Sequence, residues 1–166
     1  MNIATQKNMA AFIDEKAFGA PITLTAGGAG DNTNVVGSTI DREGFSTGSL
    51  PLSMDFLVYF SATLTATKTL SLTLELDSSP DGAAWTSFAT QAATVVATGP
   101  TGGGTVTGIA RLTVAGNPGP GVSLASAGRF LRSQVTPDLS NTATDTATCI
   151  VIGVFGGFDS QPAPIN

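Results

Sequence analysis

The segment from Asp77 to Gly82 has residue types and spacing that resemble the start of a calcium-binding loop. It reads Asp-Ser-Ser-Pro-Asp-Gly, with oxygen-bearing side chains at the first, third and fifth positions and glycine at the sixth. The twelfth position, where such a loop needs a bidentate glutamate, is Phe88, and a proline stands fourth. We therefore predict no metal site here, but a hairpin turn built by Pro80, Asp81 and Gly82.

Two glycine-rich segments, residues 27–31 and 99–104, superficially resemble phosphate-binding loops. Neither is followed by Lys-Ser or Lys-Thr, and neither lies between a strand and a helix, where backbone amides bind phosphate. We interpret both as flexible loops and expect no cofactor.

Several carboxylates could in principle form the pair that glycoside hydrolysis needs: Asp41, Glu43, Asp55, Glu75 and Asp77. Such a pair lies roughly 5 to 9.5 Å apart in a cleft. Aromatic side chains usually line that cleft, and this chain has one Trp and one Tyr. The chain also has no histidine, which excludes the usual catalytic triads and most transition-metal sites. We expect no catalytic residues and no enzymatic activity.

The single cysteine, Cys149, lies in an apolar run and is expected to be a small buried hydrophobic residue. This apolar run, residues 149–158, is far shorter than the roughly 20 residues of a membrane-spanning helix. The first residues have no apolar stretch of the kind that a secretory signal needs. We therefore expect neither export nor a membrane partner.

The composition of the 166 residues predicts one folded domain with an unusual surface. Hydrophobic residues make up 42% of the chain, and charged residues only 11%, against about 25% in typical domains. Much of the surface must therefore consist of Thr, Ser, Ala and Gly, which cost little to desolvate. The net charge of −5 makes nucleic acid an unsuitable partner.

The elements that must carry these residues are strands, because apolar residues recur with period two between short clusters of Gly, Pro, Asn and Asp. In residues 69–77, four leucines alternate with polar residues, which predicts one core face and one solvent face. In residues 53–64, Leu57 and Tyr59 lie on the face opposite the main apolar set, which predicts cover on both faces. About eight strands are expected, at residues 21–25, 35–41, 53–64, 69–77, 85–89, 106–115, 129–136 and 146–155.

This pattern favours an all-β fold, a single-domain jelly-roll-like antiparallel β-sandwich, with an immunoglobulin-type sandwich as the alternative. We place the sandwich at residues 21–158, an N-terminal arm at 1–20 and a C-terminal tail at 159–166. Apolar residues in the two arms are predicted to contact neighbouring subunits: Phe12, Ile13, Phe18, Pro162, Pro164 and Ile165. The alternative is that the front arm folds back onto its own sandwich.

Three stretches carry a resemblance to a known family. They are residues 35–42 (Val-Val-Gly-Ser-Thr-Ile-Asp-Arg), 74–85 (Leu-Glu-Leu-Asp-Ser-Ser-Pro-Asp-Gly-Ala-Ala-Trp) and 156–163 (Gly-Gly-Phe-Asp-Ser-Gln-Pro-Ala). In this order and spacing they resemble the capsid cement, or decoration, proteins of short-tailed bacteriophages, the group typified by the Bordetella phage cement protein. The resemblance spans most of residues 35–163, and its motifs are turn and strand motifs rather than catalytic ones.

The resemblance implies a jelly-roll protein made in the cytoplasm of a bacterial host and carried on the outer surface of the virion. There it would bind as a homodimer between subunits of the major capsid protein and stabilise the head against internal DNA pressure. The alternative function is a carbohydrate-binding β-sandwich module of a virion adhesin. A hydrolase is the third class considered, and no obvious set of residues supports it.

Overall fold

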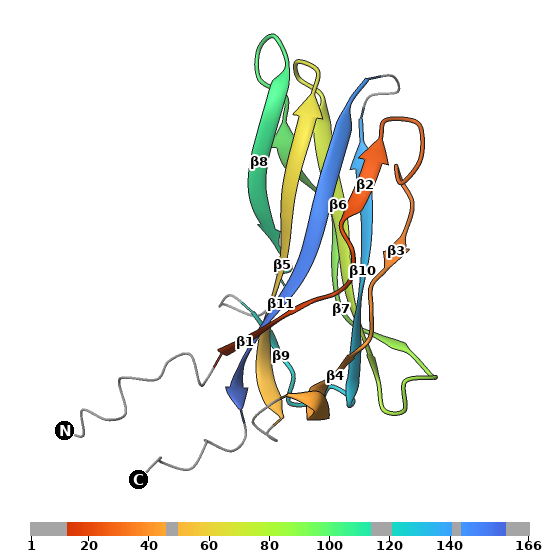
Figure 1. Ribbon diagram of the computed structural model, residues 1–166, viewed down its shortest axis with the longest axis vertical. Coiled ribbons are helices and arrows are strands. Elements are labelled where there is room, and N and C mark those ends of the chain that lie inside the picture. The colour runs from red at the N-terminus through yellow and green to blue at the C-terminus, as the bar shows by residue number, and fades with distance from the viewer. Residues whose placement is uncertain (1–12, 46–49, 114–120, 141–143, 159–166) are drawn as a thin grey trace, which may run out of the picture.

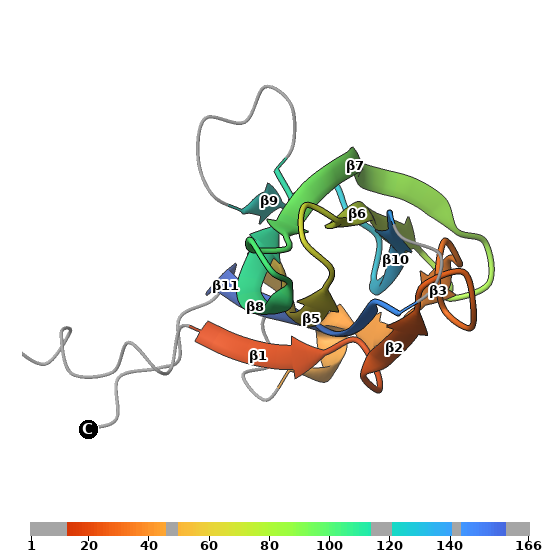
Figure 2. The same ribbon diagram turned by 90° about the horizontal axis from the view of Figure 1, so that it is seen from above.

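The protein is described by a computed structural model over residues 13–45, 50–113, 121–140 and 144–158. Two antiparallel sheets lie face to face as a sandwich (Figures 1 and 2). We call them the β5 sheet and the β6 sheet. The β5 sheet contains β1 (Ile13–Ala17), β2 (Ile22–Thr25), β5 (Pro51–Leu64), β8 (Gly104–Arg111), β9 (Val122–Ser123) and β11 (Thr146–Phe158). The β6 sheet contains β3 (Val35–Val36), β4 (Ile40–Asp41), β6 (Thr69–Ser79), β7 (Thr86–Thr98) and β10 (Phe130–Leu139).

The strand order is that of a jelly roll. The described residues form eleven strands, but three pairs of them share one edge of a neighbour: β1 and β2 on β11, β3 and β4 on β10, and β8 and β9 on β5. Counting each such pair once leaves eight positions. Their order is 1-8-3-6 in the β5 sheet and 2-7-4-5 in the β6 sheet, which is the double Greek key of a jelly roll. The predicted fold class is confirmed.

The leucines of β6 form the centre of the core. Leu70, Leu72, Leu74 and Leu76 are all fully buried, and the polar residues between them point outward. This is the predicted division into one core face and one solvent face, and it follows from the alternation of side chains along a strand. Within the described residues, no helix is long and apolar enough to cross a membrane.

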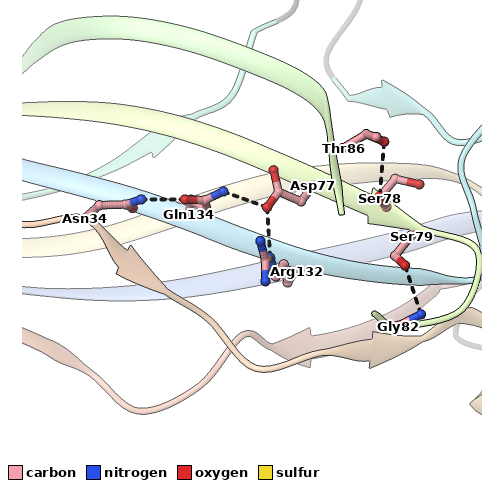
Figure 3. Close-up of polar contacts among 8 residues, drawn as sticks. All are labelled: Asn34, Asp77, Ser78, Ser79, Gly82, Thr86, Arg132 and Gln134. Atoms are coloured by element: carbon pink, nitrogen blue, oxygen red, sulfur yellow. Dashed lines mark hydrogen bonds and ion pairs between the residues drawn. The ribbon is translucent and has the colours of Figure 1, made fainter. Parts of the chain in front are cut away.

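The predicted turn at residues 80–82 is confirmed, since it joins β6 to β7 in a hairpin. The Ser79 hydroxyl accepts a hydrogen bond from the Gly82 amide at 2.9 Å (Figure 3). One oxygen of Asp81 accepts the amides of Ala84 and Ala83 at 3.0 and 2.9 Å. These donors hold the pKa of Asp81 below its ordinary value. Gly82 has φ of +77°, a conformation that glycine adopts without strain.

The N-terminal boundary of the sandwich lies earlier than expected. Strand β1 pairs with β11 over its whole length. Phe18, which follows it, is 2% exposed, and its ring centroid lies 5.7 Å from that of Phe56 in the core. The prediction that Phe18 reaches a neighbouring subunit is therefore wrong, because burial between the sheets already satisfies its ring. From Ile13 onward the front segment belongs to its own sandwich.

Other strand limits also differ from the expected ones. β7 extends to Thr98, because an edge strand with register shifts needs no strict alternation. The strand expected at 35–41 is split: the Gly37 amide binds the Ser133 carbonyl, and the Ser38 amide binds that of Phe18. β10 continues through Pro137 to Leu139, and the short β9 was not predicted.

Cys149 is fully buried in β11, as expected, and burial raises the pKa of its thiol to about 11. We predict that a thiol-specific reagent at neutral pH labels it only after unfolding, because the reactive species is the thiolate. At pH values below the ordinary thiol pKa of 9.0, burial of the neutral thiol contributes fully to the free energy of unfolding. That contribution is lost as pH rises toward about 11. Labelling with and without denaturant checks the first statement, and urea melts between these pH values check the second. Rapid labelling of the folded protein would contradict both.

Candidate interaction face

The outer surface of the β5 sheet carries an apolar row across three strands. Ile150 of β11, Tyr59 of β5 and Ile109 of β8 stand opposite one another in the strand register. Their exposed fractions are 38%, 40% and 57%. All three side chains point away from the core, because the residues on either side of each in its strand face inward. We call the surface around this row the β5 outer face.

The rows beside the apolar row differ on its two sides. On one side they consist of hydroxyl residues: Thr148, Ser61 and Thr107, then Thr146, Thr63 and Thr105. On the other side, the next row is Ile152, Leu57 and Arg111. Arg111 forms an ion pair with Asp55 in the row beyond, at 2.9 Å. The charged groups of these three strands therefore lie at one end of the face.

A shallow hollow of about 410 Å³ lies along the apolar row, lined by Tyr59, Phe60, Ser61, Thr107, Gly108, Ile109, Thr148 and Ile150. None of these residues is Asp, Glu, Lys or Arg. The hollow therefore offers apolar and hydroxyl contact without a charged group.

Of the residues predicted to contact a partner, Ile13 is accessible. It stands opposite Gly156 at the start of β1, is 47% exposed, and extends the β5 outer face across β11. Its role in binding remains a prediction. Phe12, Pro162, Pro164 and Ile165 lie outside the described residues. Ile109 and Ile150 were not among the predicted contact residues, although the two-sided apolar pattern of the strands that carry Tyr59 and Ile150 was a usable signal.

The opposite surface, on the β6 sheet, carries a network of polar side chains that bind one another (Figure 3). One oxygen of Asp77 accepts hydrogen bonds from Arg132 at 2.8 Å and from Gln134 at 2.6 Å. Asn34 in turn donates to Gln134. The guanidinium of Arg132 lies 4.3 Å from the ring centroid of Trp85. This network ties β6, β10 and the segment before β3 together.

These contacts bear on the carbohydrate-binding alternative. A sugar site on a sandwich needs aromatic faces free for stacking, but the guanidinium of Arg132 covers one face of Trp85. Tyr59 lies on the other sheet. The two side chains therefore form no joint platform. Four of the candidate carboxylates are already paired with arginines. Asp41 and Glu43 both bind Arg129. Asp77 binds Arg132, and Asp55 binds Arg111 on the other sheet.

Replacing Asp77 with alanine is expected to lower the free energy of unfolding by about 2 to 4 kcal/mol, because it leaves Arg132 without its partner at a largely desolvated position. Asp77 itself is 2% exposed. The matched control is Glu75→Ala, on the same face of β6, which should cost much less. Urea denaturation measures both. Equal effects of the two substitutions would show that the Asp77 network contributes no specific stability.

Comparisons with known proteins identify no family. No family model matches the chain, and no curated protein matches it. Among solved structures, a chain in the structure of infectious bursal disease virus, Gx strain, is similar over 92% of this chain, with 8% sequence identity and a TM-score of 0.48. The match covers 34% of that viral chain, so this protein spans about a third of its length. At this identity and TM-score the likeness assigns no function, and membership of the capsid cement family stays a prediction.

Proposed function

We propose that the protein is a structural component of a virion that decorates the outside of an icosahedral capsid and binds between subunits of the major capsid protein. The resemblance of its three sequence stretches to phage cement proteins supports this role. The polar network, and the pairing of Asp41, Glu43, Asp55 and Asp77 with arginines, support a role in contact rather than in catalysis. Among the described residues, no group of three or more Cys, Asp or Glu side chains could hold a metal ion.

The observation that carries the proposal is that the two ends of the described chain lie side by side. Ile13, the first described residue, pairs with Gly156, two residues before the end of β11. The first and last described residues therefore lie at the same end of the jelly roll (Figure 1). Residues 1–12 and 159–166 contain the predicted contact residues Phe12, Pro162, Pro164 and Ile165. Two segments that start side by side can engage one neighbouring subunit, and repeated weak contacts sum over a capsid lattice.

The first test of the proposal is the copy number in purified virions of the source that encodes the protein. Gel densitometry should find it at a level on the order of that of the major capsid protein, because a decoration protein occupies many equivalent sites. Fewer than about a tenth of the capsid protein's copies would contradict the proposal and favour an adhesin carried at few sites.

The second test separates binding from folding. Deletion of residues 1–12, or of residues 159–166, should leave the melting temperature of the free protein nearly unchanged and weaken its binding to undecorated capsids. The control is the exposed substitution Val95→Ala on β7, away from both segments, which should change neither property. Full capsid binding by both truncated proteins would show that the terminal segments are not the anchors.

A further inference from the structure

We infer that the free edge of β8 binds one extended segment of a partner protein, which joins the β5 sheet as an additional strand. The inference concerns the backbone of β8 and does not depend on the proposed function. It follows from the unpaired groups of this edge, from its lack of protection and from the shape of the space beside it.

The first argument is that the backbone of β8 is open along one side. β8 is an edge strand of its sheet and pairs with β5 alone (Figure 1). The Leu112 amide, just beyond β8, donates to the Phe56 carbonyl at 3.0 Å, so even-numbered residues of this ladder point their backbone groups toward β5. The odd-numbered ones point away from it: Thr105, Thr107, Ile109 and Arg111. Among the described residues, no hydrogen-bond partner reaches these N–H and C=O groups.

The second argument is that this edge lacks the usual protection. Proteins protect sheet edges with short strands, prolines, charges or bulges. Here β1, β2, β3, β4 and β9 have 5, 4, 2, 2 and 2 residues, and β7 pairs with β6 through three register shifts. β8 has 8 residues in continuous register with β5, contains no proline, and carries a charge only at its last residue. Such an edge is a template for strand addition.

The third argument is that the space beside β8 fits one strand. Residues 99–103 join β7 to β8 at one end of this space. At the other end, Oε1 of Gln91 on β7 accepts the Thr113 amide at 2.8 Å and the Thr113 hydroxyl at 3.2 Å. Gln91 therefore stands where a carbonyl of an added strand would stand. These closures leave room beside residues 105–111 for one strand of about seven residues. A second copy could not pair there without bringing its own β7 into the same space.

The neighbouring side chains specify the chemistry of the partner segment. Its residue opposite Ile109 would extend the apolar row and should be apolar. Its residues opposite Thr105 and Thr107 would extend the hydroxyl rows, and a residue opposite Arg111 should be acidic. The residues between these would lie beside Val106, which packs against the core, and should be apolar. The partner is therefore an extended segment of β-branched residues with an acid at one end.

The main experiment uses the full chain and a synthetic peptide written for antiparallel pairing, Lys-Lys-Glu-Val-Ile-Val-Thr-Val-Thr. Its Glu, Ile and Thr residues would stand opposite the odd-numbered residues of β8, with their N–H groups toward β8. The outward-methylated peptide carries N-methyl groups on its first two valines. The inward-methylated peptide carries them on the isoleucine and the first threonine, which removes two hydrogen bonds to β8.

Isothermal titration calorimetry should give the outward-methylated peptide a dissociation constant on the order of 10 to 100 μM. The inward-methylated peptide should bind at least about 30-fold more weakly. Hydrogen exchange followed by NMR locates the binding. The outward-methylated peptide should slow the exchange of the Thr107 and Ile109 amides at least about 10-fold, because they become hydrogen-bonded.

A pair of matched substitutions tests the edge from the side of the protein. Thr107→Pro removes an N–H that points away from β5, and an edge strand tolerates proline at such a position. It should weaken binding of the outward-methylated peptide at least about 30-fold. Thr23→Pro is the control on β2, at the opposite edge of the sheet, and should leave binding unchanged. The Thr25 amide binds the Ala29 carbonyl, so by alternation the Thr23 amide also points away from β11.

Four results would overturn the inference. They are no binding of the outward-methylated peptide at about 1 mM, equal binding of the two peptides, equal binding by the two proline variants, or self-association of the parent protein that Thr107→Pro abolishes. The last result would show that a second copy occupies the edge. Urea melts check that each variant folds. Failure of the copy-number or truncation tests would count against the proposed function alone, because the peptide experiment needs no capsid.

Discussion

Replacing Arg42 with methionine is expected to lower the free energy of unfolding by about 3 to 5 kcal/mol. Arg42 begins the short 3-10 helix η3 (Arg42–Gly44), yet its side chain is 4% exposed. One terminal nitrogen donates to the carbonyls of Ala127 and Gly128 at 2.6 and 3.0 Å. The other donates to those of Pro51 and Leu124 at 2.7 and 3.0 Å.

The reason for the large effect is that this guanidinium joins three separate segments through their backbones. Methionine keeps much of the side chain's volume, but it leaves four carbonyls without this donor in a place with little water. Arg42→Lys should restore only part of the loss, because an ammonium group cannot reach four acceptors in a planar fork.

The matched control is Arg129→Met. Arg129 is exposed and pairs with Asp41 and Glu43 at the surface, where ion pairs contribute little. Urea denaturation of the three variants gives the comparison. If Arg42→Met were no more destabilising than Arg129→Met, the buried hydrogen bonds would not contribute the stability that their geometry indicates.

Replacing Phe18 with alanine is expected to cost about 3 to 5 kcal/mol, which is the usual range for removing a buried phenylalanine. The ring packs beside Phe56 between the sheets, and deletion of its atoms leaves a cavity that the surrounding strands cannot close. The control is Ile13→Ala on the exposed side of β1, which should change the stability by no more than about 0.5 kcal/mol.

Truncation at two positions tests whether β1 and Phe18 belong to the folded domain. Removing residues 1–20 deletes β1 and Phe18 and should destabilise or unfold the protein, whereas removing residues 1–12 leaves both in place. Thermal melts of the two truncated proteins measure the difference. A protein without residues 1–20 that melts at the parent temperature would show that β1 and Phe18 are dispensable for the fold.

The sequence by itself determined the local features of the fold. The alternation of leucines in β6 determines which side chains face the core, because successive side chains of a strand point to opposite faces. Pro80, Asp81 and Gly82 determine the turn that follows, since they supply the required backbone angles and local hydrogen bonds. Burial of Cys149 likewise follows from its apolar neighbours.

Only the tertiary structure decided features that depend on partners far apart in the chain. Nothing local in Phe18 distinguishes a core residue from an anchor for another subunit, because both roles bury an aromatic ring. β5 and β11 are apolar on both faces over part of their length, and only the position of the β6 sheet decides which face becomes the core and which becomes the β5 outer face. The acceptors of Arg42 lie 9 to 86 residues away. A charged side chain can be buried there because chain folding brings those carbonyls together. No sequence pattern near residue 42 predicts these hydrogen bonds.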